Sequence, residues 1–169
     1  VAEPAWTTNA AGYHFHNWYG FGRVNVDAAV GMAQNYTEDL GEWQECGWQG
    51  SSPQVTIPAT ANGVTDNITL GDQLTIEAVQ VKVSATHSYT GDIGLELVSP
   101  SGTRSVLFTV HNGFGASDDL SDMVLLSNAF YGENSQGDWQ LKAVDAYPAE
   151  DSGTLDSWSI RVLGRGSCN

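Results

Sequence analysis

The hydrophobic residues near the N-terminus follow a helical period. Within the stretch "NVDAAVGMAQNY", apolar side chains recur three and four positions apart, at Val26, Ala29, Val30 and Ala33. This spacing places them on one face of a helix, and Asn25 is a residue type that caps helix N-termini. The pattern therefore predicts one helix over about 25–36, preceded by an irregular, glycine-punctuated stretch.

From about residue 55 the hydrophobic period changes to two. Alternating apolar residues share a face in five runs: Val79, Val81, Val83; Ile93, Leu95, Leu97; Val106, Phe108, Val110; Trp139, Leu141, Ala143; and Trp158, Ile160, Val162. Each run ends in turn chemistry such as "YTGD", "SPSG" or "EDSG". Short alternating strands with regular turns predict an all-β fold, an antiparallel β-sandwich or jelly roll of about eight strands over 55–164.

The two patterns are separated by residues 37–54, "TEDLGEWQECGWQGSSPQ", which are polar and contain glycine. Such composition is typical of a domain boundary. The chain of 169 residues suits one domain, or one domain plus a piece of another. We therefore expect an N-terminal segment over 1–36, a linker over 37–54, a β-domain over 55–164 and a short tail over 165–169.

The charge balance narrows the possible partners. The chain has 6 Lys and Arg against 20 Asp and Glu, which gives a net charge of −14. Binding to nucleic acid or to an anionic membrane surface needs clustered cations, so we expect neither partner. No apolar run approaches the roughly 20 residues of a membrane span. The acidity is compatible with divalent cations.

The two cysteines flank the β-rich region. Cys46 lies just before this region and Cys168 is the penultimate residue. Low lysine content, abundant glycine, serine and threonine, and acidity are typical of secreted proteins, so we predict a disulfide between them. Closing a loop on the order of 100 residues stabilises a fold by up to about 4–5 kcal/mol. Two unpaired thiols are the alternative.

The sequence contains no motif that predicts a catalytic site. "GFG" at residues 20–22 lacks the third glycine and the preceding strand of a dinucleotide fingerprint. His14 and His16 could share one face of an extended segment, but no third metal ligand is suitably spaced. No serine has the glycine-flanked context of a nucleophile elbow. We therefore expect no catalytic nucleophile in this chain.

Acidic residues at the turns predict a calcium site on the β-domain. Asp92 begins one strand, Asp145 ends another, and Glu150 and Asp151 follow in the "AEDSG" turn. Calcium takes six to eight oxygen ligands from carboxylates and loop carbonyls, which such turns can supply if they converge. A second candidate cluster consists of Asp118, Asp119 and Asp122. The alternative is that these carboxylates cap turns and face solvent.

Three stretches resemble a known family. They are "VSATHSYTGDIGLELVSPSGTRSVLF" (83–108), "GDWQLKAVDAYPAEDSGTLDSWSIRVLG" (137–164) and the intervening "DLSD…FYGE". They are similar to the P domain, or Homo B domain, which follows the catalytic domain in kexin, furin-like convertases and bacterial subtilisin-like proteases. The resemblance covers roughly 55–164 and implies a β-sandwich that stabilises the catalytic domain and assists its maturation.

The front of the chain extends the resemblance. "WTTNAAGYHFHNWYGFGRVNVDAAVGMAQNY" (6–36) is similar to the last segment of the catalytic domain in the same enzymes. It implies that Trp6, Trp18, Tyr19 and Phe21 form a contact surface between domains. The family's serine block, G-T-S-x-[AS]-x-P, does not occur in the sequence, so no catalytic residue carries over. The resemblance implies a non-catalytic region of a secreted serine endopeptidase, with the catalytic domain as partner.

A second function stays open at this point. A free-standing jelly-roll module could bind carbohydrate or a cell surface, and a row of surface tryptophans would support that function. Trp139 and Trp158 are in phase with apolar strand residues and are predicted to be core. Trp43 and Trp48 lie in the expected linker.

Overall fold

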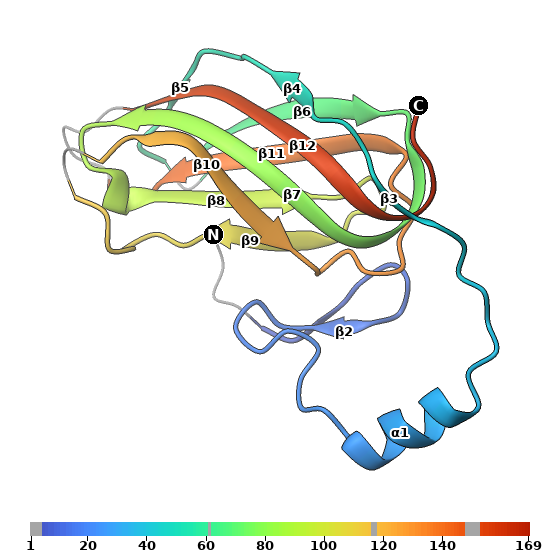
Figure 1. Cartoon of the computed structure of the whole chain (residues 1–169). Helices are drawn as coiled ribbons and strands as arrows, with labels where there is room; N and C mark the ends of the chain where they lie inside the picture. The colour runs from blue at the N-terminus through green and yellow to red at the C-terminus, as the bar shows by residue number, and fades with distance from the viewer. Residues whose placement is uncertain (1–4, 61, 116–117, 148–152) are drawn as a thin grey trace.

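The computed structural model describes residues 5–60, 62–115, 118–147 and 153–169 and shows two antiparallel β-sheets packed face to face (Figure 1). In the larger sheet, the strand order is β10-β7-β12-β3, with β4 and β5 also paired to β12. Its strands are β3 (Trp43–Glu45), β4 (Gln49–Ser51), β5 (Val55–Ile57), β7 (Gln73–His87), β10 (Leu120–Ser127) and β12 (Gly153–Ser167).

In the smaller sheet, the strand order is β6-β11-β8-β9. Its strands are β6 (Val64–Leu70), β8 (Ile93–Val98), β9 (Arg104–Phe108) and β11 (Gly137–Asp145). The predicted all-β sandwich is confirmed.

The core lies between the two sheets and follows the period-two pattern. β7 and β12 pair along their length, so that Val83 lies opposite Trp158 and Val81 opposite Ile160. These inward side chains are buried, as are Trp139 and the alternate residues of β8 and β11. Trp139 and Trp158 are therefore core residues, as predicted. Such cross-strand apolar pairs stabilise a sheet because each buries its neighbour's surface.

The expected linker is shorter in the structure than the 37–54 predicted from composition. β3 and β4 lie inside this stretch and both pair with β12, with Glu45 opposite Leu163 and Gly50 opposite Ser159. Strands of three residues carry too short a pattern to reveal a period, and pairing to the long β12 holds them in place. The sandwich therefore begins at Trp43.

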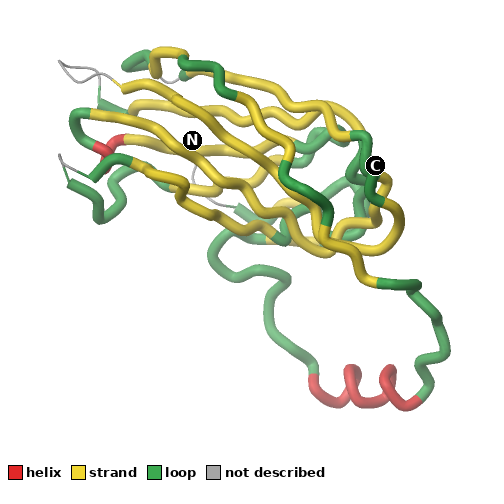
Figure 2. The backbone as a smooth tube through the Cα atoms, turned by 45° about the horizontal axis from the view of Figure 1, so that its top comes forward, coloured by secondary structure: helices red, strands yellow, loops and turns green. Residues whose placement is uncertain are grey.

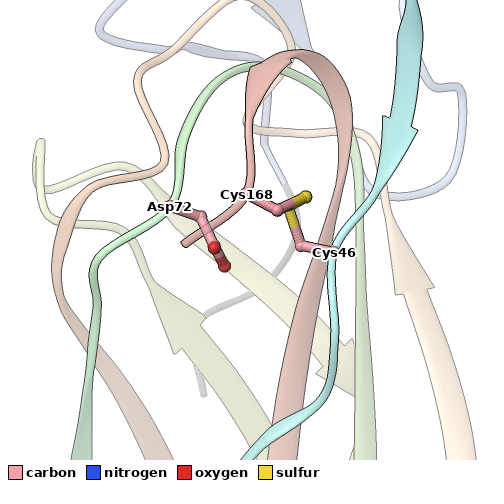
Figure 3. A group of neighbouring side chains, drawn as sticks. All are labelled: Cys46, Asp72 and Cys168. Carbon is pink, nitrogen blue, oxygen red and sulfur yellow. A yellow bond between two sulfur atoms is a disulfide. The ribbon is translucent and has the colours of Figure 1, made fainter.

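A disulfide joins Cys46 to Cys168, with Cα atoms 5.4 Å apart, as predicted (Figure 3). It ties the end of β3 to the end of β12 across 122 positions of sequence. The Asp72 carboxylate lies beside the two sulfur atoms and accepts a hydrogen bond from the Asn169 amide at 2.8 Å. The two sulfur atoms are bonded to each other, so the group of Cys46, Asp72 and Cys168 provides no thiolate for a metal ion.

The N-terminal segment lies outside the sandwich. It contains a small hairpin of β1 (Thr7–Thr8) and β2 (His14–Phe15), followed by the helix α1 (Val26–Gln34). The Asn25 side chain caps this helix by accepting a hydrogen bond from the Ala28 amide, as predicted. None of the helix residues is buried, and the helix projects away from the sheets on two loops (Figure 2). No helix in the described ranges is long and apolar enough to cross a membrane.

Candidate domain-interface surface

Asn9 fixes the N-terminal segment to the sandwich. Its side chain is buried, and its Nδ2 donates hydrogen bonds to the carbonyls of Ala129 at 3.0 Å and Tyr131 at 2.8 Å. Its Oδ1 accepts from the amides of Ala11 at 3.1 Å and Tyr13 at 2.9 Å. Both ends of the amide are therefore satisfied, one by the sandwich and one by the segment itself. Replacing this side chain would leave buried backbone groups unpaired.

Glu133 makes a second contact beside Asn9. This carboxylate is buried and accepts hydrogen bonds from the Ala10 amide at 3.0 Å, from Ser99 Oγ at 2.7 Å and from the Thr103 hydroxyl. The Ala10 amide also donates to Thr103 Oγ1 at 3.1 Å. Ionised acceptors form stronger hydrogen bonds than neutral ones, so this carboxylate anchors the segment at a fixed position.

A cluster of aromatic rings continues the contact. Tyr13 packs edge-on against Tyr131 with ring centroids 5.0 Å apart, and Phe21 packs against Phe15, Tyr13 and Tyr131. Gly132 lies beneath Tyr13 with a φ of +81°, and a Cβ there would lie 2.7 Å from the Tyr13 ring. Glycine is therefore required both by the left-handed backbone and by the close approach of the ring.

The opposite side of the N-terminal segment is exposed. Trp6, Trp18 and Tyr19 are 53%, 64% and 64% exposed, although their rings pack against the buried His16. Further apolar side chains around α1 are also exposed: Val24, Val26, Val30, Met32, Tyr36 and Leu40. All four residues predicted to form an interface are therefore exposed, and Phe21, at 48%, also belongs to the aromatic cluster. Large exposed apolar surfaces are typical of interfaces, so this side of the segment is a candidate contact surface.

Sequence reasoning missed the residues that attach the segment to the sandwich. Asn9 belongs to the W-x-x-N stretch and Glu133 to "FYGE", both of which carried the family resemblance. Nothing in the sequence pairs them with groups on the other part of the chain, because the Asn9–Tyr131 contact joins residues 122 positions apart.

The structure brings Asp92 and Asp145 to the same end of the smaller sheet. The Ala146 amide donates to the Asp92 carbonyl at 3.0 Å, and Asp145 lies opposite Ile93 in the strand register. Both carboxylates are buried. Asp145 accepts from the Tyr147 amide at 3.0 Å and lies 3.3 Å from His87 Nε2. Glu150 and Asp151 lie outside the described residues.

In the second acidic cluster, Asp118 caps a turn, whereas Asp119 and Asp122 contact residues of β7. Asp118 accepts from the Gly115 amide at 2.9 Å and Asp119 from the His87 amide at 3.1 Å, while Asp122 lies beside Ser84. His14 and His16 differ in environment, since His14 is exposed near Thr8 and His16 is buried against aromatic rings. Within the described ranges, neither these histidines nor these carboxylates form a group of three metal ligands.

Comparison with known proteins assigns the sandwich. The family model described as the proprotein convertase P-domain matches residues 76–162. The chain belongs to this family. The match runs from Ile76 in β7 to Val162 in β12 and includes β8, β9, β10 and β11. β3 lies outside the matched range but pairs with β12 in the same sheet.

The chain is similar to a bacterial serine protease and to furin. The Aeromonas extracellular serine protease of Aeromonas sobria is 36% identical over 198 aligned positions, which cover 94% of this chain and 31% of that protein. Furin of Rattus norvegicus is 27% identical and covers 96% of this chain and 21% of its own length. The crystal structure of the serine protease of Aeromonas sobria superposes with a TM-score of 0.86 at 34% identity, covering 95% of this chain and 33% of that one.

These comparisons extend beyond the sandwich. An alignment over 94% of the chain includes most of the N-terminal segment as well as the P domain. The chain spans about a third or less of the length of these relatives. The predicted resemblance to the P domain of furin-like and bacterial subtilisin-like proteases is therefore confirmed.

Proposed function

We propose that this chain is the non-catalytic P-domain region of a secreted subtilisin/kexin-like serine endopeptidase. In this proposal the sandwich stabilises the catalytic domain and assists its maturation, and residues 1–36 are the last segment of that catalytic domain. The chain alone hydrolyses no peptide. The name of the relative from Aeromonas sobria, an extracellular serine protease, supports secretion of the full-length protein, and so does the Cys46–Cys168 disulfide.

The observation that carries this proposal is the division of the N-terminal segment into two sides. One side is attached to the sandwich by the buried Asn9 side chain and by the Ala10 amide, which donates to the buried Glu133 carboxylate. The other side presents Trp18, Tyr19 and the apolar residues of α1 to solvent. At about 25 cal/mol per Å2 of apolar surface, each such side chain contributes roughly 1–3 kcal/mol when a partner covers it. A segment with these two sides is suited to join two domains.

The proposal is tested by altering the exposed side in the full-length protease. Replacing Trp18 and Tyr19 by serine should lower the yield of mature enzyme and its thermal midpoint, because the two domains lose apolar contact. The preference for the substrate residue at the cleaved bond should not change. Trp43→Ser is the matched control, since Trp43 is 47% exposed on the sandwich. Unchanged yield and stability together with altered substrate preference would contradict a scaffold role.

The calcium site at Asp92 and Asp145 stays a prediction. The two carboxylates are neighbours and buried, and the ion-pair partners that the described residues give them are histidines, His111 at 3.9 Å and His87 at 3.3 Å. A divalent cation would offset two buried negative charges. Both Asp145 oxygens already have hydrogen-bond partners, which leaves Asp92 as the freer ligand.

Thermal melts with millimolar calcium and with chelator test this site. A cation that binds only the folded state stabilises it by about 2.7 kcal/mol at a hundredfold excess over Kd. We expect the midpoint to fall with chelator in the native chain and to fall less in Asp92→Asn. An identical thermal midpoint with calcium and with chelator, in protein of verified metal content, would show that calcium does not bind the folded chain.

A further inference from the structure

The outward face of the larger sheet is lined by small hydroxyl side chains. Thr56, Thr86 and Thr154 lie side by side on β5, β7 and β12, because Thr154 is in register with both of the others. Further along the same two long strands, Ser84 and Ser159 occupy outward positions next to the buried Val83 and Trp158. Hydroxyls both donate and accept hydrogen bonds, so this face offers a dense array of both kinds of group.

Two adjoining hollows interrupt this face. The first, of about 340 Å3, is lined by the three threonines together with His87 and Asp119. The second, of about 230 Å3, has a floor of small residues that includes Gly50, Ser157 and Ser159, and it is bordered by Lys82 and Asp122. Thr86, Ser84 and Lys82 are successive outward positions of β7, so the hollows follow one another over about 13 Å at 3.3 Å per residue.

Lys82 is held at the border of the second hollow by an aromatic ring. Its ammonium lies 4.9 Å from the centre of the Trp48 ring, and the Arg161 guanidinium lies 4.6 Å from the same ring. Such cation–π contacts fix the position of a long, flexible side chain. Trp48 and Lys82 therefore form an ordered wall at this end of the face.

Asp122 is placed at the same hollow by an irregular backbone. It lies in a bulge of β10 between Leu120 and Met123, with a φ of +48°. Its amide donates to Ser84 Oγ at 3.0 Å, which fixes the bulge to β7. Bulges redirect side chains, and a left-handed residue other than glycine persists only where its surroundings enforce it.

The charges around the second hollow favour an uncharged ligand. Lys82 and Asp122 border the same hollow with opposite charge, and the chain as a whole carries −14, which disfavours polyanions. A ligand that matches paired donors and acceptors over a narrow, hydroxyl-lined strip is itself rich in hydroxyls. We propose that the outward face of the larger sheet binds a strand of neutral polysaccharide, with Lys82 and Asp122 hydrogen-bonded to sugar hydroxyls over the second hollow.

This binding face is separate from the domain-interface surface. Asn9 and Ala10 contact Thr103 and the residues around Tyr131 and Glu133, none of which lines either hollow. The polysaccharide proposal therefore does not rest on the proposed protease function, and either proposal can fail alone.

Affinity electrophoresis of the whole chain in gels that contain xylan, β-glucan or galactomannan tests the proposal, with alginate as the anionic comparison. We expect retardation by at least one neutral polysaccharide. Lys82→Ala should weaken the affinity about tenfold, the effect of losing one hydrogen bond from a charged donor. Lys142→Ala removes the same charge from an outward position of β11 and should leave the affinity unchanged.

A second variant blocks the hollow directly. A Cβ at Gly50 makes ordinary contacts of 3.5 Å, so Gly50→Gln is accommodated by the backbone while its side chain fills the floor. It should abolish retardation, whereas Gly113→Gln, at a position with open space around it, should not. The proposal is overturned if no neutral polysaccharide retards the chain, if alginate retards it more strongly, or if the control variants weaken binding as much as the test variants.

Discussion

The sandwich, over 43–167, and the N-terminal segment, over 5–42, differ in how far they bury their largest aromatic side chains. In the sandwich Trp139 and Phe130 are fully buried and Trp158 is 2% exposed. In the N-terminal segment Trp18 and Tyr19 are 64% exposed. Both regions belong to one chain in one solvent, so the difference lies in what surrounds each ring.

The two regions differ in what covers their apolar side chains. Each sheet covers the apolar face of the other. The segment has a two-stranded hairpin and a nine-residue helix, and within the described ranges no second layer lies over its exposed side. Isolated helices shorter than about 12–15 residues are marginal in water. In the proposed function, a surface outside residues 43–167 covers this side of the segment.

The largest expected effect is on the sandwich core. Trp139→Ala removes a fully buried ring that packs edge-on against Phe130 and donates a hydrogen bond to the Ser135 carbonyl at 2.8 Å. Its loss should lower the free energy of unfolding by about 3–5 kcal/mol. Urea unfolding followed by circular dichroism measures the change. A loss below about 1 kcal/mol would show that the two regions do not differ as described.

The disulfide should have the next largest effect. Replacing Cys46 and Cys168 together by serine frees β3 and the end of β12, and should cost about 2–4 kcal/mol in urea unfolding. Alkylation before and after reduction, read by intact mass, checks the starting state. Two thiols that alkylate in the native, unreduced chain would contradict the pairing.

A smaller, local effect is expected at Asn9. Asn9→Ala removes the side chain that bonds to Ala129 and Tyr131, at about 1–3 kcal/mol for the groups left unpaired. Amide hydrogen exchange should become faster in residues 5–22 and stay unchanged in β7 and β12. Asn67→Ala, at an exposed position of β6, is the control. Faster exchange throughout the sandwich would mean that the segment is part of the sandwich fold.

The smallest effect in the isolated chain is expected on α1. Val30→Ser and Met32→Ser alter side chains that are more than half exposed, so the thermal midpoint of the isolated chain should shift by less than the equivalent of about 0.5 kcal/mol. Differential scanning calorimetry measures the midpoint. A large destabilisation would show that α1 packs against the sandwich and that the two regions do not differ as described.

The long strands could be predicted from the sequence because their period reflects local geometry. Val79, Val81 and Val83 alternate because one face of β7 is buried, and the helix cap at Asn25 is equally local. β3 and β4 could not be predicted, since β12 supplies their pairing. The anchoring role of Asn9 and Glu133 could not be predicted either, because it depends on contacts between residues more than 100 positions apart in the sequence.

The candidate site was predictable to a similar extent. The family resemblance implied a contact surface of Trp6, Trp18, Tyr19 and Phe21, and all four side chains are exposed in the structure. The convergence of Asp92 and Asp145 followed only from the pairing of β8 with β11, which the separate strand patterns do not specify.

In the proposed full-length protease, a second domain covers the exposed side of the N-terminal segment. Hydroxyl-radical footprinting of the isolated chain and of the full-length protein tests it directly, with Trp43 as an internal exposed reference. We predict that labelling of Trp18 and Tyr19 falls several-fold in the full-length protein while labelling of Trp43 stays the same. Equal labelling of Trp18 and Tyr19 in both proteins would contradict it.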